Sequence, residues 1–215
     1  MNRVGLAEAI EVATAGSPGG SPGMTWSRCS TARVRMFGAM AGVAYQVDPA
    51  ESQRRRAGGH GAVTELGIID ALLGLPTGIP VPWTAVSDRD RRRLRRAPSG
   101  AVESRGDQLV RQATVPLTVR FALVAARQWR DGLVKAGRFA PYCCRAMLLS
   151  RVPGDLDEAK VQAAFYGIGI YLVSRGELTT VVVPEPFTES RHSPAQWWFA
   201  EEVYRQVSDS STSGG

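Results

Sequence analysis

The sequence predicts an α/β fold in which a mixed central sheet is flanked by helices. Between residues 100 and 207, β-branched and apolar segments alternate with amphipathic ones. The run VRFALVAARQWRDGLVKAGRFAPYCCRAMLL, residues 119–149, has the pattern of strand, helix and strand. The 215 residues are 44% hydrophobic and 21% charged, which is typical of a globular protein.

The first expected helix lies in AVTELGIIDALLG, residues 62–74, where apolar residues recur at helical spacing and Gly74 ends the element. The prolines of residues 75–83 favour an extended loop. Ser87 is expected to cap a short basic helix that ends before Pro98, because two aspartates lie in its first turn and arginines follow them.

Residues 108–117 and 118–126 are apolar and β-branched, so we expect two strands there, arranged as a hairpin. A helix over residues 127–140 and a buried strand over residues 143–152 should follow. The final segments predict a helix, a hairpin and a last helix.

Local signals define these final elements. Asp155 with Glu158 predicts a capping box at the start of a helix. Residues 167–173 and 178–184 flank the turn SRGE and predict a hairpin. Ser193 as N-cap, with proline next to it, starts the last helix.

The expected domain organisation is one α/β domain over residues 59–207. Residues 1–58 contain the linker GSPGGSPG and end in a basic turn, so we expect a disordered or loosely structured extension. Residues 208–215, SDSSTSGG, are expected to be a disordered tail.

Composition sets limits on the function. The net charge is +6 and 24 of the 26 basic residues are arginine, a balance that permits nucleic-acid binding. No apolar run is long enough for a membrane span and the N-terminus lacks a signal-peptide pattern, so we expect a cytoplasmic protein. Cys143 and Cys144 are expected to be small residues at the start of a buried strand, with a vicinal redox disulfide as the alternative.

Residues 62–187 resemble the PD-(D/E)XK phosphodiesterase superfamily, which has the restriction-endonuclease-like fold. TELGIIDALL is similar to its first helix, with Glu65 in the place of the helix acid. Residues 127–149 resemble the helix and strand after the catalytic core, and residues 159–187 resemble the closing helix and hairpin. The resemblance implies nuclease ancestry and a site in which acids and an acid-x-Lys act with a metal ion.

The chain departs from that pattern on the strand RFALVAA. Ala122, Leu123 and Val124 occupy the place of the acid-x-Lys. Carboxylates bind Mg²⁺ and the lysine helps to polarise the attacking water, and apolar side chains do neither. We therefore expect a catalytically degenerate nuclease-like domain that needs no cofactor and binds nucleic acid or a protein partner.

Two alternatives remain open. An active nuclease with a migrated site would use Glu65, Glu103 and Asp107 with Lys135, and Mg²⁺ or Mn²⁺ would bind at Glu65 and Asp107. The chain could instead be an interaction protein without a nucleic-acid partner. The plainer interpretations are that Glu65 is an exposed helix carboxylate and Asp107 a turn aspartate.

The candidate nucleic-acid contacts are six arginines in the segment SDRDRRRLRR. They are Arg89, Arg91, Arg92, Arg93, Arg95 and Arg96. Set against two aspartates, they leave four net positive charges in ten residues, which would attract a phosphate backbone. Consecutive arginines point around the whole helix, so some of them must be solvated. Trp197, Trp198 and Phe199 could stack on bases, although packing against a sheet is the simpler role.

Overall fold

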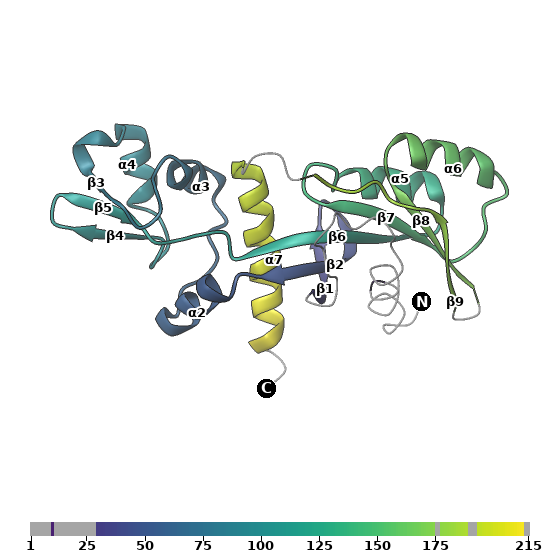
Figure 1. Ribbon diagram of the computed structural model, residues 1–215, viewed down its shortest axis with the longest axis horizontal. Coiled ribbons are helices and arrows are strands. Elements are labelled where there is room, and N and C mark those ends of the chain that lie inside the picture. The colour runs from purple at the N-terminus through teal and green to yellow at the C-terminus, as the bar shows by residue number, and fades with distance from the viewer. Residues whose placement is uncertain (1–9, 11–28, 175–176, 189–192, 213–215) are drawn as a thin grey trace. The chain divides into compact units, whose positions relative to one another are not determined.

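The computed structural model describes residues 10, 29–174, 177–188 and 193–212, and it confirms the α/β class (Figure 1). The chain divides into two compact units, each assembled from two stretches of sequence. Unit 1 comprises residues 1–46 and 119–190, and unit 2 comprises residues 47–118 and 191–215. The structure thus differs from the single domain expected over residues 59–207.

Unit 1 is built on a mixed six-stranded sheet. Its strands, in spatial order, are β1 (Ser30–Met36), β2 (Ala39–Val47), β6 (Leu117–Ala126), β7 (Cys144–Leu149), β8 (Gly169–Ser174) and β9 (Glu177–Val182). The pairs β6–β7 and β7–β8 are parallel, whereas β1–β2 and β8–β9 are antiparallel. The antiparallel pairing of β8 with β9 confirms the hairpin expected from residues 167–184.

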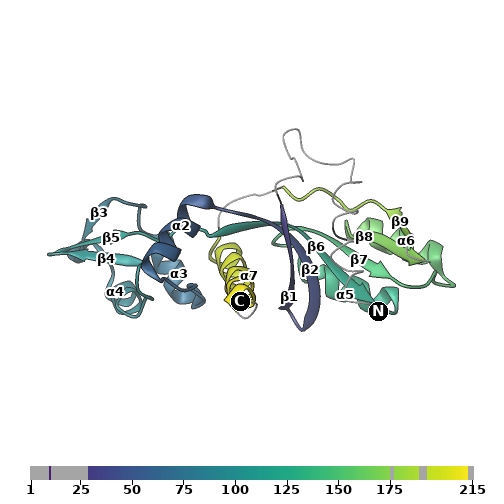
Figure 2. The ribbon, with the colours of Figure 1, turned by 90° about the horizontal axis from the view of Figure 1, so that it is seen from below.

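The hairpin β1–β2 corrects the expectation of a loosely structured extension, which is wrong for residues 30–58. Ser30 pairs with Tyr45, and Val34 and Val43 are completely buried. Figure 2 shows β2 beside β6. The strand AMAGVAYQV is rich in alanine and glycine, so it lacks the β-branched alternation by which strands are recognised. Residues 1–9 and 11–28 lie outside the described part of the chain.

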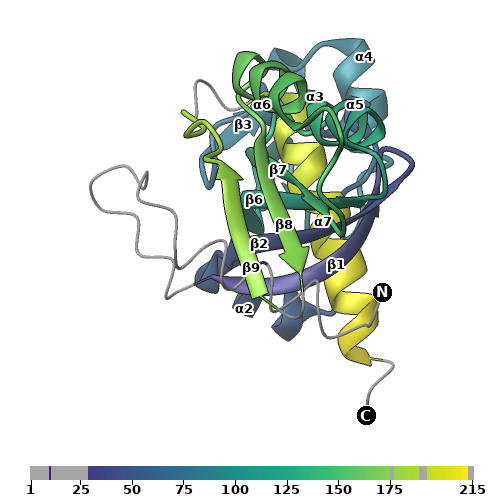
Figure 3. The same cartoon turned by 90° about the vertical axis from the view of Figure 1, so that its right-hand side faces the viewer.

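Two helices connect the parallel strands and lie on the same face of the sheet (Figures 1 and 3). Helix α5 (Trp129–Gly137) follows β6, and helix α6 (Leu156–Phe165) follows β7. At Gly132 of α5 an added Cβ would come within 2.7 Å of Met147 Sδ, so this glycine lets the helix approach β7 closely. On the opposite face of the sheet, Phe121 and Leu123 belong to a buried apolar cluster that also contains Leu148 and Tyr171.

Unit 2 contains a three-stranded antiparallel sheet, ordered β3 (Pro80–Pro82), β5 (Gln108–Arg111) and β4 (Val102–Arg105). The hairpin expected between residues 108–117 and 118–126 is therefore wrong, because β5 pairs in this sheet and β6 in the other. Residues 112–116 separate the two strands, and Pro116 has no N–H to donate to a ladder.

Three of the four described α-helices of unit 2 begin where local sequence predicts, and the first of the four replaces the basic turn expected at the end of residues 1–58. They are α2 (Pro49–Gly58), α3 (Leu66–Leu73), α4 (Asp88–Leu94) and α7 (Pro194–Thr212), with a short 3-10 turn, η2 (Trp83–Ala85), before α4. Ser87 Oγ accepts a hydrogen bond from Asp90 N at 3.1 Å, and Ser193 exchanges hydrogen bonds with Gln196. Because α7 continues to residue 212, the tail expected from residue 208 is wrong for residues 208–212.

A buried ion network joins α2 to α7. The Arg55 side chain is 1% exposed, and its two Nη atoms each donate to one carboxylate oxygen of Glu201 at 2.7 Å. Arg55 Nε donates to Glu51, also at 2.7 Å. Burial alone would lower the pKa of Arg55, but the two carboxylates raise it above its ordinary value.

The Glu201 carboxylate also satisfies two other buried donors. Val63 N and Trp197 Nε1 each donate to it at 2.9 Å. Trp197 packs in the apolar core of unit 2 with Ile69 and Leu72. The Glu201 carboxylate thus accepts hydrogen bonds from α2, from α7 and from the segment that precedes α3.

We expect Glu201→Ala to lower the free energy of unfolding by about 3–5 kcal/mol, because it leaves the Arg55 charge buried without its partner. Urea denaturation of the full chain measures this difference. Glu202→Ala is the matched control on the same helix. Glu202 pairs with the exposed Arg205, so its loss should cost less than about 1 kcal/mol. Equal losses in the two variants would contradict the role of the network.

Candidate anion-binding site

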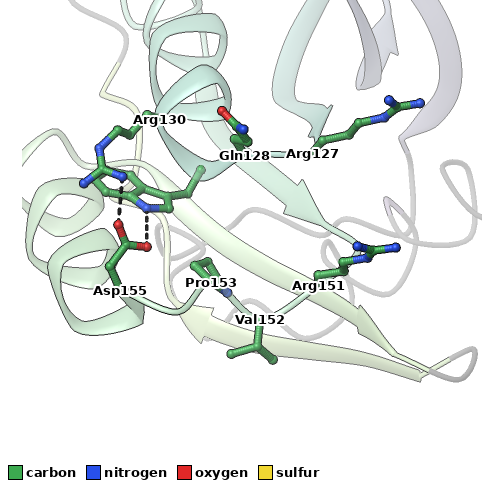
Figure 4. Close-up of a pocket in the computed structure, with 8 residues that line it drawn as sticks. Arg127, Gln128, Arg130, Arg151, Val152, Pro153 and Asp155 are labelled. Carbon is green, nitrogen blue, oxygen red and sulfur yellow. Dashed lines mark hydrogen bonds and ion pairs between the residues drawn. The ribbon is translucent and has the colours of Figure 1, made fainter.

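A pocket opens where the parallel strands β6 and β7 end. The register pairs Ala126 with Leu149, so the segments after these residues leave the sheet side by side. In open α/β sheets, ligands bind at the carboxyl ends of the strands. The pocket has a volume of about 310 Å³ and is lined by Arg127, Gln128, Trp129, Arg130, Arg151, Val152, Pro153 and Asp155 (Figure 4).

Arg127 and Arg151 supply the uncommitted positive charge of the pocket. Both are exposed, and neither forms a hydrogen bond or ion pair with any residue that the structure describes. Their guanidinium groups extend toward the same side in Figure 4. Arginine stays charged at any ordinary pH, and its planar fork matches the oxygens of a carboxylate or phosphate.

Arg130 and Asp155 lie on the opposite side of the pocket (Figure 4), and Trp129 contacts both of them. Trp129 Nε1 donates to Asp155 Oδ1 at 2.9 Å, and Arg130 Nη1 donates to Oδ2 at 2.7 Å. The Trp129 hydrogen bond, followed by that of Arg130, lowers the pKa of Asp155. Arg130 also pairs with Glu158 and lies 4.2 Å above the Trp129 ring.

The capping box expected at Asp155 is wrong. Asp155 occupies the N-cap position of α6, but its side chain accepts no hydrogen bond from the helix backbone. Its carboxylate binds Trp129 and Arg130 instead, and Glu158 also turns to Arg130. Partners from α5 therefore displace the local capping contacts.

The charges of the lining residues sum to a positive site. Arg130 is balanced by Asp155, so Arg127 and Arg151 leave two net positive charges. The first turns of α5 and α6 also face this edge, and neither helix has a side-chain cap. This arrangement suits an anion, because helix N-termini and arginines both favour negative charge.

The three carboxylates of the migrated-site alternative each have their own surroundings. Glu65 pairs with Arg96 at 3.1 Å, and Glu103 with Arg105 at 2.9 Å. Asp107 follows Gly106 in the exposed β4–β5 turn, as the turn interpretation predicts. Within the described residues, no group of three or more His, Cys, Asp or Glu is placed to hold a metal ion.

The structure also places Lys135 of that alternative and the apolar triplet of the strand RFALVAA. Lys135 belongs to α5 of unit 1 and pairs with Asp131 at 2.7 Å, whereas the three carboxylates belong to unit 2. Ala122, Leu123 and Val124, at the place of the acid-x-Lys, are at most 1% exposed in the middle of β6. That strand segment is core.

Most of the six candidate arginines on α4 and directly after it have partners among neighbouring side chains. Arg91 pairs with Asp88, Arg93 with Asp70 and Asp90, and Arg96 with Glu65, while Arg95 lies over the Trp83 ring. Arg89 and Arg92 are exposed and form no ion pair within the described part of the chain. These pairs weaken the local positive potential that the arginine run suggests.

The cysteines and the aromatic cluster of α7 are structural. Cys143 is buried and Cys144 half-buried, both are free, and burial raises the pKa of Cys144 to about 11. The pair is thus protonated and unreactive, as its interpretation as small buried residues predicts. Trp197 and Phe199 are at most 2% exposed, so neither ring can stack on a base. Trp198 is half-buried and packs against the core cluster that contains Trp197.

Arg127 and Arg151 are the site residues that sequence reasoning missed. Arg127 comes directly after the apolar strand β6, in AARQW, and Arg151 comes two positions after the apolar strand β7, in LLSRVP. That placement is a usable signal, because the residues that follow parallel strands gather at one edge of the sheet.

We expect Trp129→Phe to raise the pKa of Asp155 toward the ordinary aspartate value, because it removes the first of the two hydrogen bonds to this carboxylate. Carboxyl chemical shifts followed by NMR from pH 2 to pH 6 measure the change. Because the native pKa is depressed, the stabilisation from this contact is present above the ordinary value and lost as pH falls through the native pKa. An unchanged pKa in the variant would remove Trp129 as its cause.

No helix in the described ranges combines the length and apolar character needed to cross a membrane. Comparisons with protein-family models, with curated proteins and with solved structures each found no match for this chain.

Proposed function

We propose that the chain is a non-catalytic nucleic-acid-binding module whose phosphate contacts are Arg127 and Arg151. The observation that carries this proposal is that two arginines without a described partner line one pocket at the ends of β6 and β7. Phosphate contacts of this kind supply most of the affinity of sequence-independent nucleic-acid binding. Arginine supplies them best, because its fork donates two hydrogen bonds to one phosphate.

The distribution of charge supports the proposal. Unit 1 has 13 arginines and lysines against nine aspartates and glutamates, so four of the six net positive charges belong to it. In unit 2 the arginines are largely matched by acids, including the buried Glu51 and Glu201. A polyanion is therefore attracted more strongly to unit 1.

We propose a non-catalytic module because of the apolar residues in the middle of β6 and because of the partners of the candidate carboxylates. A nuclease of the PD-(D/E)XK type needs acids and a lysine around one metal ion. Here Ala122, Leu123 and Val124 are core residues, and Glu65 and Glu103 form ion pairs with arginines. We infer that the chain is a degenerate relative of such nucleases that binds its ligand without cutting it.

The test is fluorescence anisotropy of the full chain with labelled single- and double-stranded DNA at low and moderate salt. We expect Arg127→Ala/Arg151→Ala to weaken binding at low salt by roughly tenfold or more, because two charge-assisted contacts are lost. The slope of log K against log salt should fall by about two. Arg33→Ala/Arg105→Ala is the matched control, since it removes the same charge from exposed positions on β1 and β4.

Three other results would contradict the proposal. One is a lack of binding by the unmodified chain at low salt, and another is Mg²⁺-dependent cutting that EDTA stops. The third is an equal loss in Arg33→Ala/Arg105→Ala, which would reduce the effect to total charge. A parallel Arg89→Ala/Arg92→Ala variant tests α4, and a larger loss there would move the contact surface to that helix.

A protein-interaction module is the second candidate, and exposed apolar residues on α6 favour it. Val161 is 67% exposed and Phe165 is 79% exposed, one helical turn apart. Exposed apolar surface of this kind is typical of protein contacts. A specific partner that Phe165→Ser fails to bind, together with no salt-sensitive DNA affinity, would favour this candidate over nucleic-acid binding.

A further inference from the structure

We infer that the pocket at the ends of β6 and β7 selects a phosphomonoester, the terminal phosphate of a strand or nucleotide, over the internal phosphodiesters of a backbone. This inference rests on the proposed function, because it concerns the same two arginines. It adds a preference that sequence-independent backbone binding does not have.

The first argument is charge. Arg130 is held by Asp155 at 2.7 Å and by Glu158 at 2.9 Å, so these two carboxylates outweigh its single charge and it offers no free positive charge to a ligand. The uncommitted charge is that of Arg127 and Arg151, two units in all. A phosphomonoester carries about −1.5 to −2 at neutral pH, whereas an internal phosphodiester carries about one negative charge. Only Arg127 and Arg151 remain free to pair with a ligand, and their two guanidinium groups match the two charges of a terminal phosphate better than the single charge of an internal one.

The second argument is shape. A volume of about 310 Å³ lies at the lower end of the range for small-ligand pockets. Arg130 and Asp155 lie on one side of the pocket and Val152 with Pro153 on another (Figure 4). An internal phosphate can enter the pocket only if the nucleic-acid strand runs into the pocket and out again. A terminal phosphate enters with one attached sugar.

The third argument is preorganisation. Trp129 is 5% exposed and is fixed by its hydrogen bond to Asp155, and Arg130 stacks on the Trp129 ring at 4.2 Å. This side of the pocket holds its position before a ligand arrives, so little ordering cost remains for it on binding. The other partners are the exposed side chains of Arg127 and Arg151, which follow the ends of β6 and β7.

The phosphomonoester could belong to an oligonucleotide end or to a free mononucleotide, since both present the same group. The experiment separates these sources. Anisotropy of the full chain is measured with one single-stranded oligonucleotide, 3′-labelled, carrying either a 5′-phosphate or a 5′-hydroxyl. Adenosine monophosphate, adenosine and inorganic phosphate are then used as competitors.

We expect the 5′-phosphorylated strand to bind about fivefold or more tightly than the 5′-hydroxyl strand, because its terminal group makes an additional doubly charged contact. Arg127→Ala/Arg151→Ala should abolish this preference, and Arg127→Lys/Arg151→Lys should reduce it, since lysine keeps the charge but loses the fork. Arg33→Ala/Arg105→Ala should keep the preference. Competition by adenosine monophosphate but not adenosine would support the inference with a mononucleotide as the source.

The preference should also shrink at pH 5, where the phosphomonoester loses its second negative charge. The arginines do not titrate there, and Asp155 stays ionised because its pKa is lowered.

Equal affinity for the two strands, lost in Arg127→Ala/Arg151→Ala, would overturn the inference and leave the proposed function standing. A preference that survives in that variant would place the terminal-phosphate contact elsewhere and overturn it as well. No binding of either strand, and no competition by adenosine monophosphate or phosphate, would overturn both. These outcomes separate a failure of end recognition from a failure of nucleic-acid binding.

Discussion

The bidentate contact between Arg55 and Glu201 constrains unit 2 more than any other interaction described. Taking an arginine and two carboxylates out of water costs several kcal/mol per ion, and only good geometry with further hydrogen bonds offsets that cost. Arg55 meets the condition with Glu51, Glu201 and the carbonyls of Gly61 and Thr114 as acceptors. Each acceptor comes from a different part of the chain, so α2, the entry to α3, residue 114 and α7 must all be in place together.

Sequence predicted the elements that depend on residues a few positions apart. The caps Ser87 and Ser193 contact residues three positions further along the chain. The buried strand β7 is recognisable from its own continuous run of apolar residues. Sequence did not predict what depends on distant partners. Strand β2 is rich in alanine and glycine and is recognisable as a strand only through its pairing with β1, and Asp155 turns to α5 because Trp129 lies within reach.

The same distinction separates the two sets of arginines. The run on α4 is conspicuous in the sequence, but Asp70 and Glu65, 23 and 31 positions away from their partners, neutralise part of it. Arg127 and Arg151 are isolated in the sequence and come together only through the parallel register of β6 with β7. A charge count along the chain therefore overestimated the first set and missed the second, because the potential at a surface depends on which acids lie nearby.

The central position of β6 in the six-stranded sheet explains both its apolar middle and the charged residues that follow its end. β6 lies between β2 and β7, and residues 121–124 are buried on both faces of the sheet. A carboxylate or lysine there would lose its hydration without a partner, which costs far more than apolar packing returns. Polar chemistry on this strand is therefore confined to its ends. At the carboxyl end, β7 runs parallel and terminates at the same level, so residues that are remote in sequence share one pocket. The strand whose middle is apolar core is thus also the strand whose end lines the pocket.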